Sequence, residues 1–199
     1  MIKIIEVNKS KPYKVFQNYY NLAMDKDQHN IEAISISSFN KSLNEVQSRY
    51  VNLKYILGDE WIFFSNYKSE KAESFHKHNQ VSALFYWSEI NTQIRIKALI
   101  KKTNKEFSDK HFLNRSNEKN ALAISSSQSE RINSYQDVIK NYQTILNEKT
   151  SLSVRPDYWG GYSFIPYYFE FWEGHQSRLN KREVFIQNNN EWESFILQP

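Results

Sequence analysis

The strongest constraint on the fold comes from residues 92–100, where apolar and polar side chains alternate. Positions 94, 96, 98 and 100 are apolar, whereas positions 93, 95 and 97 are polar or charged. Because successive side chains of a strand point to opposite faces of a sheet, this pattern predicts an antiparallel strand with one buried face. Residues 31–37, 49–55, 61–65 and 81–87 also read as strands.

Segments with helical periodicity lie before and between these strands. Residues 12–27 predict an amphipathic helix, and shorter helices are predicted at residues 69–79 and 107–115. Residues 130–149 carry a long apolar stripe, and Ser127 with Glu130 fits a capping box at its start.

Strands rich in aromatic residues return at residues 158–162, 169–172 and 192–196. The sequence therefore predicts a mainly β fold with flanking helices (α+β), in which six antiparallel strands form a small barrel.

The composition fits one soluble domain. The chain has 199 residues, of which 40% are hydrophobic and 16% aromatic, enough to bury a sizeable core. We expect a single domain over residues 1–199, with residues 1–11 as a flexible segment. Charge interrupts residues 1–6 too early for a signal peptide, and no apolar run reaches membrane-spanning length. We therefore expect a cytoplasmic protein without a membrane partner.

Several kinds of active site are excluded or disfavoured. The chain has no cysteine, so a thiolate metal site and a cysteine nucleophile are excluded. His76 and His78 point to different sides of a predicted helix, and we expect no metal site. The serines at 125–127 and 129 have no recognisable His and Asp partners. Gly160 and Gly161 lack the spacing of a phosphate-binding loop and fit a bulge or strand entry.

Basic residues recur near the ends of the predicted elements. The net charge of +4 is too small to choose between nucleic acid, an acidic surface and small phosphorylated ligands. If the barrel brings the basic residues together, they form one or two anion sites. The aromatic residues at 167–172 could stack nucleic-acid bases, but core and interface packing is the commoner use of such a cluster.

Three carboxyl-terminal segments in combination carry a family resemblance: residues 155–162 (RPDYWGGY), 169–174 (FEFWEG) and 178–182 (RLNKR). Upstream, residues 49–54, 64–66, 69–72, 93 and 127–129 fall in the order and approximate spacing of flavin-binding segments. Over roughly residues 12–199, the chain resembles the pyridoxamine 5′-phosphate oxidase family of FMN-binding split β-barrels.

The resemblance implies a homodimer that binds FMN at the subunit interface and oxidises a small phosphorylated substrate, with no nucleic-acid partner. In the family, the flavin takes a hydride equivalent from the carbon that bears the amine or alcohol, and oxygen reoxidises it to give peroxide. The implied FMN contacts are Arg49, Tyr50, Val51, Lys54, Phe64, Ser65, Lys71, Gln93, Gln128, Ser129, Trp172 and Arg182. The implied substrate contacts are Lys54, His111, Arg115, Lys119, Arg178 and Asn180, with Arg178 as the catalytic residue.

Four positions depart from the family pattern. His111 replaces a tyrosine and Lys119 a serine, but both still donate hydrogen bonds, so we expect anion binding to survive. Asn180 replaces a histidine and cannot take over its proton transfer. Glu70 replaces an arginine and would repel the FMN phosphate unless it turns outward or pairs with a neighbouring lysine.

The leading hypothesis is an FMN-dependent oxidase of pyridoxamine or pyridoxine 5′-phosphate that yields pyridoxal 5′-phosphate and hydrogen peroxide. Two alternatives stay open. One is a relative that oxidises a different small anionic ring compound, because the departures gather at the substrate and phosphate positions. The other is a non-catalytic flavin-binding or nucleic-acid-binding barrel.

Overall fold

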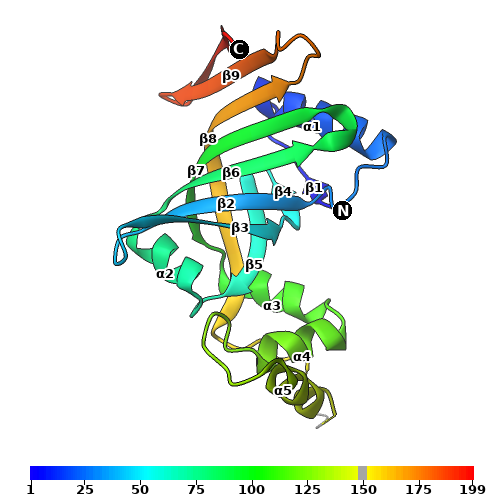
Figure 1. The fold of residues 1–199 in the computed structure, drawn as a ribbon, viewed down its shortest axis with the longest axis vertical. Coiled ribbons are helices and arrows are strands. Elements are labelled where there is room, and N and C mark those ends of the chain that lie inside the picture. The colour runs from blue at the N-terminus through cyan, green and yellow to red at the C-terminus, as the bar shows by residue number, and fades with distance from the viewer. Residues whose placement is uncertain (148–151) are drawn as a thin grey trace.

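The computed structural model describes residues 1–147 and 152–199, and it consists of one ten-stranded sheet with helices at its sides (Figure 1). The strands are β1 (Lys3–Ile5), β2 (Ala33–Asn40), β3 (Glu45–Asn52), β4 (Tyr55–Leu57), β5 (Glu60–Asn66), β6 (Gln80–Trp87), β7 (Thr92–Lys102), β8 (Trp159–Glu173), β9 (Lys181–Asn188) and β10 (Glu191–Leu197). The helices are α1 (Lys11–Asp25), α2 (Glu70–Lys77), α3 (Lys105–Leu113), α4 (Asn117–Ser125) and α5 (Tyr135–Asn147), with a 3-10 turn η1 (Ser88–Ile90). The mainly β prediction holds; the whole sheet has ten strands, where the sequence predicted a barrel of six antiparallel strands, and β1 pairs with β4 in parallel.

The longest strand, β8, organises the sheet. One of its edges pairs with β7 from residue 162 to residue 173. The other edge pairs with β5 through residues 159–164 and with β9 through residues 168–173. The strand therefore runs from the α3–α5 side of the molecule, the helical end, to the β9–β10 side, the hairpin end (Figure 1). The sheet order β1-β4-β5-β8-β7-β6-β2-β3 curls until β3 comes within 8 Å of β5.

The sequence predicted two strands where β8 is continuous. The register between β7 and β8 shifts at one point, where Lys97 pairs with Tyr168 and Ala98 pairs with Pro166. This leaves Tyr167 as an extra residue in the ladder. A bulge tolerates a proline that a regular ladder would exclude, because proline has no N–H to donate. The strand thus passes through Pro166 without ending.

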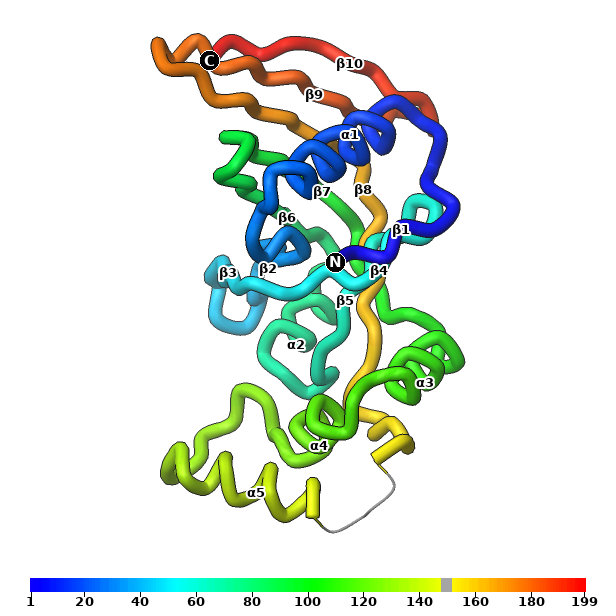
Figure 2. Tube along the Cα trace, turned by 90° about the vertical axis from the view of Figure 1, so that its right-hand side faces the viewer, coloured from blue at the N-terminus to red at the C-terminus, as the bar shows by residue number. Residues whose placement is uncertain are grey.

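Helix α1 covers the core of the barrel. Pro12 suits the first turn of a helix, and the side chains that recur at helical spacing, Tyr13, Phe16, Tyr20 and Ala23, are buried. The Phe16 ring lies 4.4 Å from the ring of Trp61 between centroids. Figure 2 shows α1 crossing the strands on the side of β6 and β7.

The amino-terminal segment was predicted to be flexible, and the structure instead places part of it in the sheet. Residues 3–5 form β1 alongside β4. The backbone N–H of Ile2 donates a hydrogen bond to the Tyr20 hydroxyl at 3.1 Å, and the Ile2 side chain is buried. This contact anchors the segment to α1.

The helix predicted from residue 130 begins five residues later. The turn at Ser127 and Glu130 is not a helix start, and the capping pair is Ser134 and Asp137. The Asp137 N–H donates to Ser134 Oγ at 3.1 Å, and Ser134 Oγ donates to Asp137 Oδ2 at 2.9 Å. The predicted residues 148 and 149 lie outside the described residues. Helix α4, which the sequence did not predict, precedes this loop.

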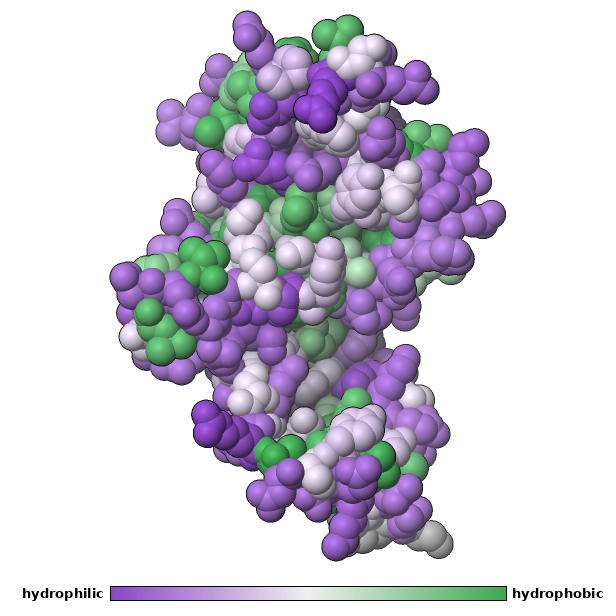
Figure 3. Space-filling view, viewed as in Figure 1, coloured by the Kyte–Doolittle hydropathy of each residue, from purple (hydrophilic) through white to green (hydrophobic). Residues whose placement is uncertain are grey.

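Hydrophilic side chains cover most of the face shown in Figure 3, and apolar residues interrupt them in several places. Val46 and Tyr50, on the edge strand β3, are 70% and 75% exposed. None of the helices in the described part of the chain combines the length and apolar content needed to span a bilayer.

Gly160 and Gly161 enter β8 where two side chains press against its backbone, which agrees with the strand entry predicted for them. A Cβ atom would lie 2.2 Å from the Tyr67 hydroxyl oxygen at Gly160 and 2.5 Å from Thr103 Oγ1 at Gly161. The Tyr67 hydroxyl also donates a hydrogen bond to the Gly161 carbonyl at 3.1 Å. The glycines therefore provide space for these side chains.

We expect Gly160→Ala to lower the free energy of unfolding by about 1–3 kcal/mol, because the added methyl group overpacks the Tyr67 contact. Ser163→Ala is the matched control in the same strand, because Ser163 is fully buried and its hydroxyl has no partner among the described residues. We expect this control to keep or raise the stability. Urea unfolding monitored by tryptophan fluorescence measures both, and an unchanged midpoint for Gly160→Ala would contradict the expectation.

Candidate active site

The predicted site residues fall into two groups around β8. The first lies near the helical end and along β3, and it comprises Arg49, Tyr50, Val51, Phe64, Ser65, Lys71, His111, Arg115, Lys119, Gln128 and Ser129, with Lys54 between β3 and β4. The second lies at the hairpin end on β7, β8, β9 and the β8–β9 loop, and it comprises Gln93, Trp172, Arg178, Asn180 and Arg182.

The two groups are far apart within one chain. Arg115 lies over Trp159 at the start of β8, and Arg182 pairs with Trp172 near its end. Along a strand, these two tryptophans are separated by on the order of 40 Å. Arg115 and Arg182 of one chain therefore cannot contact the same small ligand.

A cavity between β3 and α2 holds two cations. This β3–α2 pocket has a volume of about 520 Å³, and a neighbouring cavity lined by residues between Ser125 and Asn141 has a volume of about 340 Å³. It is lined by Gln47, Ser48, Arg49, Tyr50, Glu70, Lys71, Gln128 and Ser129. Burial, and then the nearby charge of Arg49, lower the pKa of Lys71 to about 8. Two cations held this close together favour the binding of an anion.

Arg49 is held in place by its neighbours on two strands. Its Nη1 donates hydrogen bonds to Ser38 Oγ at 2.8 Å, to the Gln47 carbonyl at 2.9 Å and to the Ile36 carbonyl at 3.3 Å. Burial lowers the pKa of Arg49, and the carboxylate of Glu70 opposes that shift. The guanidinium is thus a fixed donor at the wall of the β3–α2 pocket.

Glu70 lies in the same pocket, and its partner is Gln47. The Gln47 side-chain amide donates to Glu70 Oε1 at 2.5 Å, so the carboxylate is turned toward β3. From the sequence, we expected Glu70 either to turn outward or to pair with a neighbouring lysine, and its hydrogen-bond partner is instead Gln47. The negative charge also raises the pKa of Lys71, against the larger lowering effects of burial and Arg49.

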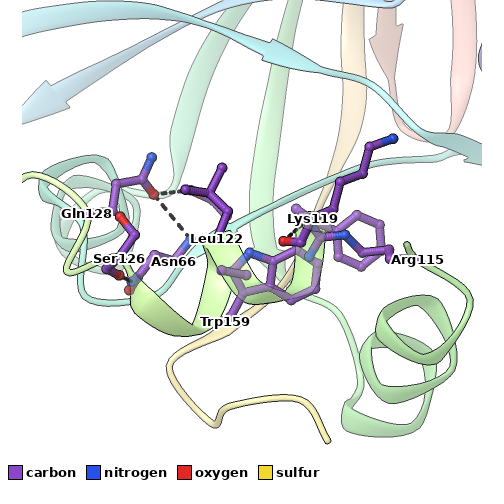
Figure 4. A pocket seen from close by; sticks show the side chains of 10 residues that line it. Asn66, Arg115, Lys119, Leu122, Ser126, Gln128 and Trp159 are labelled. Carbon is purple, nitrogen blue, oxygen red and sulfur yellow. Dashed lines mark hydrogen bonds between the residues drawn. The ribbon is translucent and has the colours of Figure 1, made fainter. Parts of the chain in front are cut away.

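A second cavity of 230 Å³, the Trp159 pocket, adjoins the first through Gln128. Its lining is Phe64, Ser65, Asn66, Arg115, Lys119, Leu122, Ala123, Ser126, Gln128 and Trp159 (Figure 4). Gln128 Oε1 accepts hydrogen bonds from Ser65 Oγ at 3.2 Å and from the Asn66 N–H at 3.4 Å. The lining contains two cations and no carboxylate, so the pocket suits an anionic ligand.

Arg115 lines this pocket and has one buried hydrogen-bond donor without a partner among the described residues. Its guanidinium carbon lies 4.3 Å from the centre of the Trp159 ring system, and its Nη2 donates to the Lys119 carbonyl at 3.0 Å. Nη1 is buried and has no partner among the described residues. Burial lowers the pKa of Arg115 to about 10, which leaves it charged at neutral pH. A buried charged donor without a partner is costly unless a ligand completes it.

His111 is stacked beside the Trp159 pocket. Its ring is nearly parallel to that of Phe64, 3.6 Å away between centroids, and its Nδ1 shares a hydrogen bond with the Tyr55 hydroxyl at 2.9 Å. Burial, then the charges of Arg115, Lys54 and Lys3, lower the pKa of His111 to about 4. The imidazole is therefore neutral at physiological pH.

The hairpin-end group forms a row across three strands. Gln93 pairs with Trp172, and Trp172 pairs with Arg182. In the loop that follows β8, Arg178 has a left-handed backbone with φ of 59°, and its N–H donates to the His175 carbonyl at 2.9 Å. Asn180 Oδ1 accepts from the His175 N–H at 3.0 Å, so its carbonyl oxygen is used within the loop.

Sequence reasoning assigned no role to Trp159, Tyr55 or Glu170, although all three contact predicted site residues. Trp159 and Glu170 lie inside the motifs that carry the family resemblance, which was the available signal. No pattern pointed to Tyr55, because its contact with His111 joins residues 56 positions apart. Within the described residues, no three His, Cys, Asp or Glu side chains are arranged to hold a metal ion.

Comparison with known proteins identifies the family. The family model described as "Pyridoxine 5'-phosphate oxidase C-terminal dimerisation region" matches residues 159–199. Pyridoxine/pyridoxamine 5'-phosphate oxidase of Leptospira interrogans is 30% identical over 98% of this chain and 92% of its own length. The enzyme of that name from Cytophaga hutchinsonii is 33% identical over 94% of this chain and 88% of its own length.

Solved structures show the same fold. PhzG from Burkholderia lata, in complex with tetrahydrophenazine-1-carboxylic acid, superposes with a TM-score of 0.89 at 24% identity and covers 96% of this chain and 93% of its own. A pyridoxamine 5'-phosphate oxidase-related, FMN binding protein from Nostoc punctiforme gives a TM-score of 0.78 at 11% identity, over 96% of this chain and 99% of its own. The predicted split-barrel fold is confirmed. The chain belongs to the pyridoxine/pyridoxamine 5'-phosphate oxidase family.

Proposed function

We propose that this FMN-dependent oxidoreductase oxidises pyridoxamine and pyridoxine 5′-phosphate to pyridoxal 5′-phosphate, with hydrogen peroxide as the second product. One observation carries the proposal: two cationic pockets adjoin each other and share Gln128. An oxidase of this kind must hold two phosphate-bearing molecules side by side, the cofactor and the substrate. The β3–α2 pocket serves the first and the Trp159 pocket the second.

The β3–α2 pocket fits the phosphate end of FMN. Arg49 and Lys71 supply the positive charge. Burial lowers the pKa of Lys71, and a bound anion would raise that pKa again. Ser129, whose φ of 76° places it in the left-handed region, lines the same pocket. FMN, when bound, accepts a hydride equivalent from the substrate carbon and passes the electrons to oxygen.

The protein's own residues bind and orient the substrate. Arg115 offers its guanidinium to the substrate phosphate, and Lys119 adds a second cation at the same wall. Neutral His111 contributes a hydrogen bond without adding charge. Arg178 approaches the reacting ring from the β8–β9 loop. Its left-handed backbone is fixed there by the hydrogen bond from its N–H to the His175 carbonyl.

A homodimer explains why the two groups of residues are separated in one chain. FMN must contact Arg49 and Lys71 from one group and Trp172 and Arg182 from the other. Since the groups lie at different ends of β8, a second subunit supplies the missing half of each site. The matching of residues 159–199 to a dimerisation region supports this arrangement, as does the exposed Tyr50 on β3.

A different anionic ring compound remains a second candidate substrate. Asn180 stands at the position of a family histidine, and its side-chain oxygen is bound to the His175 backbone. An amide cannot transfer protons as an imidazole does. Lys119 also gives the Trp159 pocket a second cation. These two features alter the substrate side while leaving the β3–α2 pocket in place.

The first test is the visible absorption of the purified protein, followed by anaerobic addition of each substrate in the same cuvette. We expect a yellow protein that is bleached by pyridoxamine or pyridoxine 5′-phosphate, and that regains its colour with oxygen. A yellow protein that neither compound bleaches would favour the second candidate. A colourless protein that cannot take up FMN would contradict both.

Removing one residue from each group separates their roles. We expect Arg49→Ala to lose FMN, because Arg49 supplies one of the two cations of the β3–α2 pocket. We expect Arg178→Ala to retain FMN but to turn over slowly, because it acts on the substrate side. FMN affinity by fluorescence quenching and steady-state oxidation measure the two effects, and the reverse pattern would show that the roles are wrongly assigned.

Mixing these two impaired variants tests the shared site. In a heterodimer, one site carries both substitutions and the other site carries neither. Random pairing makes half of the dimers mixed, so we expect about a quarter of the wild-type activity after co-refolding. Each variant refolded alone is the control. No recovery in mixtures whose subunits have exchanged would mean that each site is built from one chain.

Lys71 predicts a pH dependence for FMN binding. Its pKa of about 8 means that the ammonium is present below that pH and is lost as the pH rises through it. The affinity for FMN should therefore be flat below pH 8 and fall by up to about tenfold per pH unit above it. Lys71→Arg is the control, because an arginine stays charged and should flatten the profile. The same slope in both proteins would contradict the assignment.

A further inference from the structure

A charged side chain is buried on the outward face of β8. Phe169 and Phe171 point into the core, so the alternation of the strand places Tyr168, Glu170 and Trp172 on the opposite face. Glu170 on this face is nevertheless only 1% exposed. A buried carboxylate is costly unless its oxygens are fully paired.

Three neighbouring residues pair it. Arg95 on β7 donates from Nη1 to Oε2 at 2.7 Å, and the Tyr168 hydroxyl donates to the same oxygen at 2.9 Å. Arg182 on β9 donates from Nε to Oε1 at 2.9 Å, and its Nη2 lies 2.8 Å from the same oxygen as an ion pair. Burial, followed by the bond to Glu170, raises the pKa of Tyr168 to about 12.

These contacts fix the orientation of Arg182. Two of its nitrogens bind Glu170, and the third, Nη1, donates to the Gln198 carbonyl at 3.0 Å. All three nitrogens are therefore engaged by the protein, while the side chain keeps 26% of its surface exposed. Arg182 is paired with Trp172 in the ladder between β8 and β9, in the row that also includes Gln93.

We infer that Glu170 is a positioning residue for the cofactor, which holds the guanidinium of Arg182 in the orientation that contacts the flavin. The inference rests on the proposed function, since Arg182 and Trp172 are residues that would meet FMN. A purely stabilising role explains the burial less well. Buried ion pairs add little net stability, because desolvation offsets their attraction, whereas they do fix geometry. Glu170 acts through Arg182 and does not itself touch the ligand.

The experiment titrates FMN into apoprotein and follows the quenching of its fluorescence. We expect Glu170→Gln to raise the dissociation constant about tenfold, the size of losing one charge-assisted hydrogen bond. Glu173→Gln is the matched control on the same strand, because Glu173 also binds a basic residue of β9, Lys181 at 3.0 Å. We expect the control to leave the dissociation constant unchanged, and an unchanged constant for Glu170→Gln would overturn the inference.

A double-mutant cycle separates positioning from general stability. Once Arg182→Gln has removed the group that is positioned, adding Glu170→Gln should weaken FMN binding no further. Adding Glu170→Gln to Arg95→Gln should still weaken it, because Arg182 remains. If the double variant with Arg182→Gln loses as much FMN affinity as the product of the two single losses, the inference is overturned. Urea midpoints of the apoproteins show whether each variant is folded.

If Glu170→Gln does not fold, Glu170→Asp keeps the charge and shortens the side chain by one methylene. We expect a folded protein with weaker FMN binding, and wild-type affinity in this variant would overturn the inference. Wild-type apoprotein that fails to bind FMN would overturn the proposed function together with this inference. Wild-type binding with no effect at Glu170 overturns this inference alone.

Discussion

The pairing of β8 with β7 is the constraint on which the rest of the structure depends. The ladder runs from Thr92 opposite Glu173 to Lys102 opposite Tyr162, with one shift of register at the bulge. Because β5 and β9 share the other edge of β8, this strand fixes the positions of both Trp159 and Trp172. Arg115 lies over the ring of Trp159, and Arg182 is the strand partner of Trp172. The same strand therefore positions both groups of predicted site residues and keeps them apart within one chain.

Arg115 and Arg182 differ in how many of their hydrogen-bond donors the protein itself engages. Arg115 lies on Trp159 at the wall of the Trp159 pocket, and its buried Nη1 has no partner among the described residues, so its hydrogen-bonding capacity is not used up. Arg182 has all three nitrogens engaged by Glu170 and Gln198, so its hydrogen-bonding capacity is largely used before any ligand binds. The first arrangement favours binding energy, and the second favours a fixed geometry. A cationic site of this kind needs both, because charge alone does not orient a planar ring.

Much of this could be predicted from the sequence, and the failures have physical causes. The alternation in residues 92–100 and the helical spacing in residues 12–27 are local patterns, and both elements formed. The single strand β8 was predicted as two because Pro166 normally ends a strand, and only the ladder with β7 shows that it lies at a bulge. The start of α5 was misplaced because Ser127 and Ser134 both fit a capping motif, and local sequence does not distinguish them.

The site residues divide in the same way. Motif order was enough to nominate Arg49, Lys71, Arg115 and Arg182, and the structure places the first two in one pocket. Motif order could not identify Glu170 as the partner of Arg182, because that contact depends on the register between β8 and β9. Nor could it show that Glu70 is bound by Gln47, a residue 23 positions away. Long-range side-chain pairs of this kind are decided by the fold and leave no periodic signal.

The substituted positions show how the surrounding charge limits what a new residue can add. A histidine at position 111 could have brought another positive charge to a pocket that already contains Arg115 and Lys119. Burial and the nearby cations instead lower its pKa to about 4, so the imidazole stays neutral and the substitution changes hydrogen bonding more than charge. Glu70 reduces the positive charge of the adjoining pocket, while Lys119 increases that of the Trp159 pocket. Positive charge is thereby shifted from the β3–α2 pocket toward the Trp159 pocket, which favours the binding of an anionic group in the Trp159 pocket.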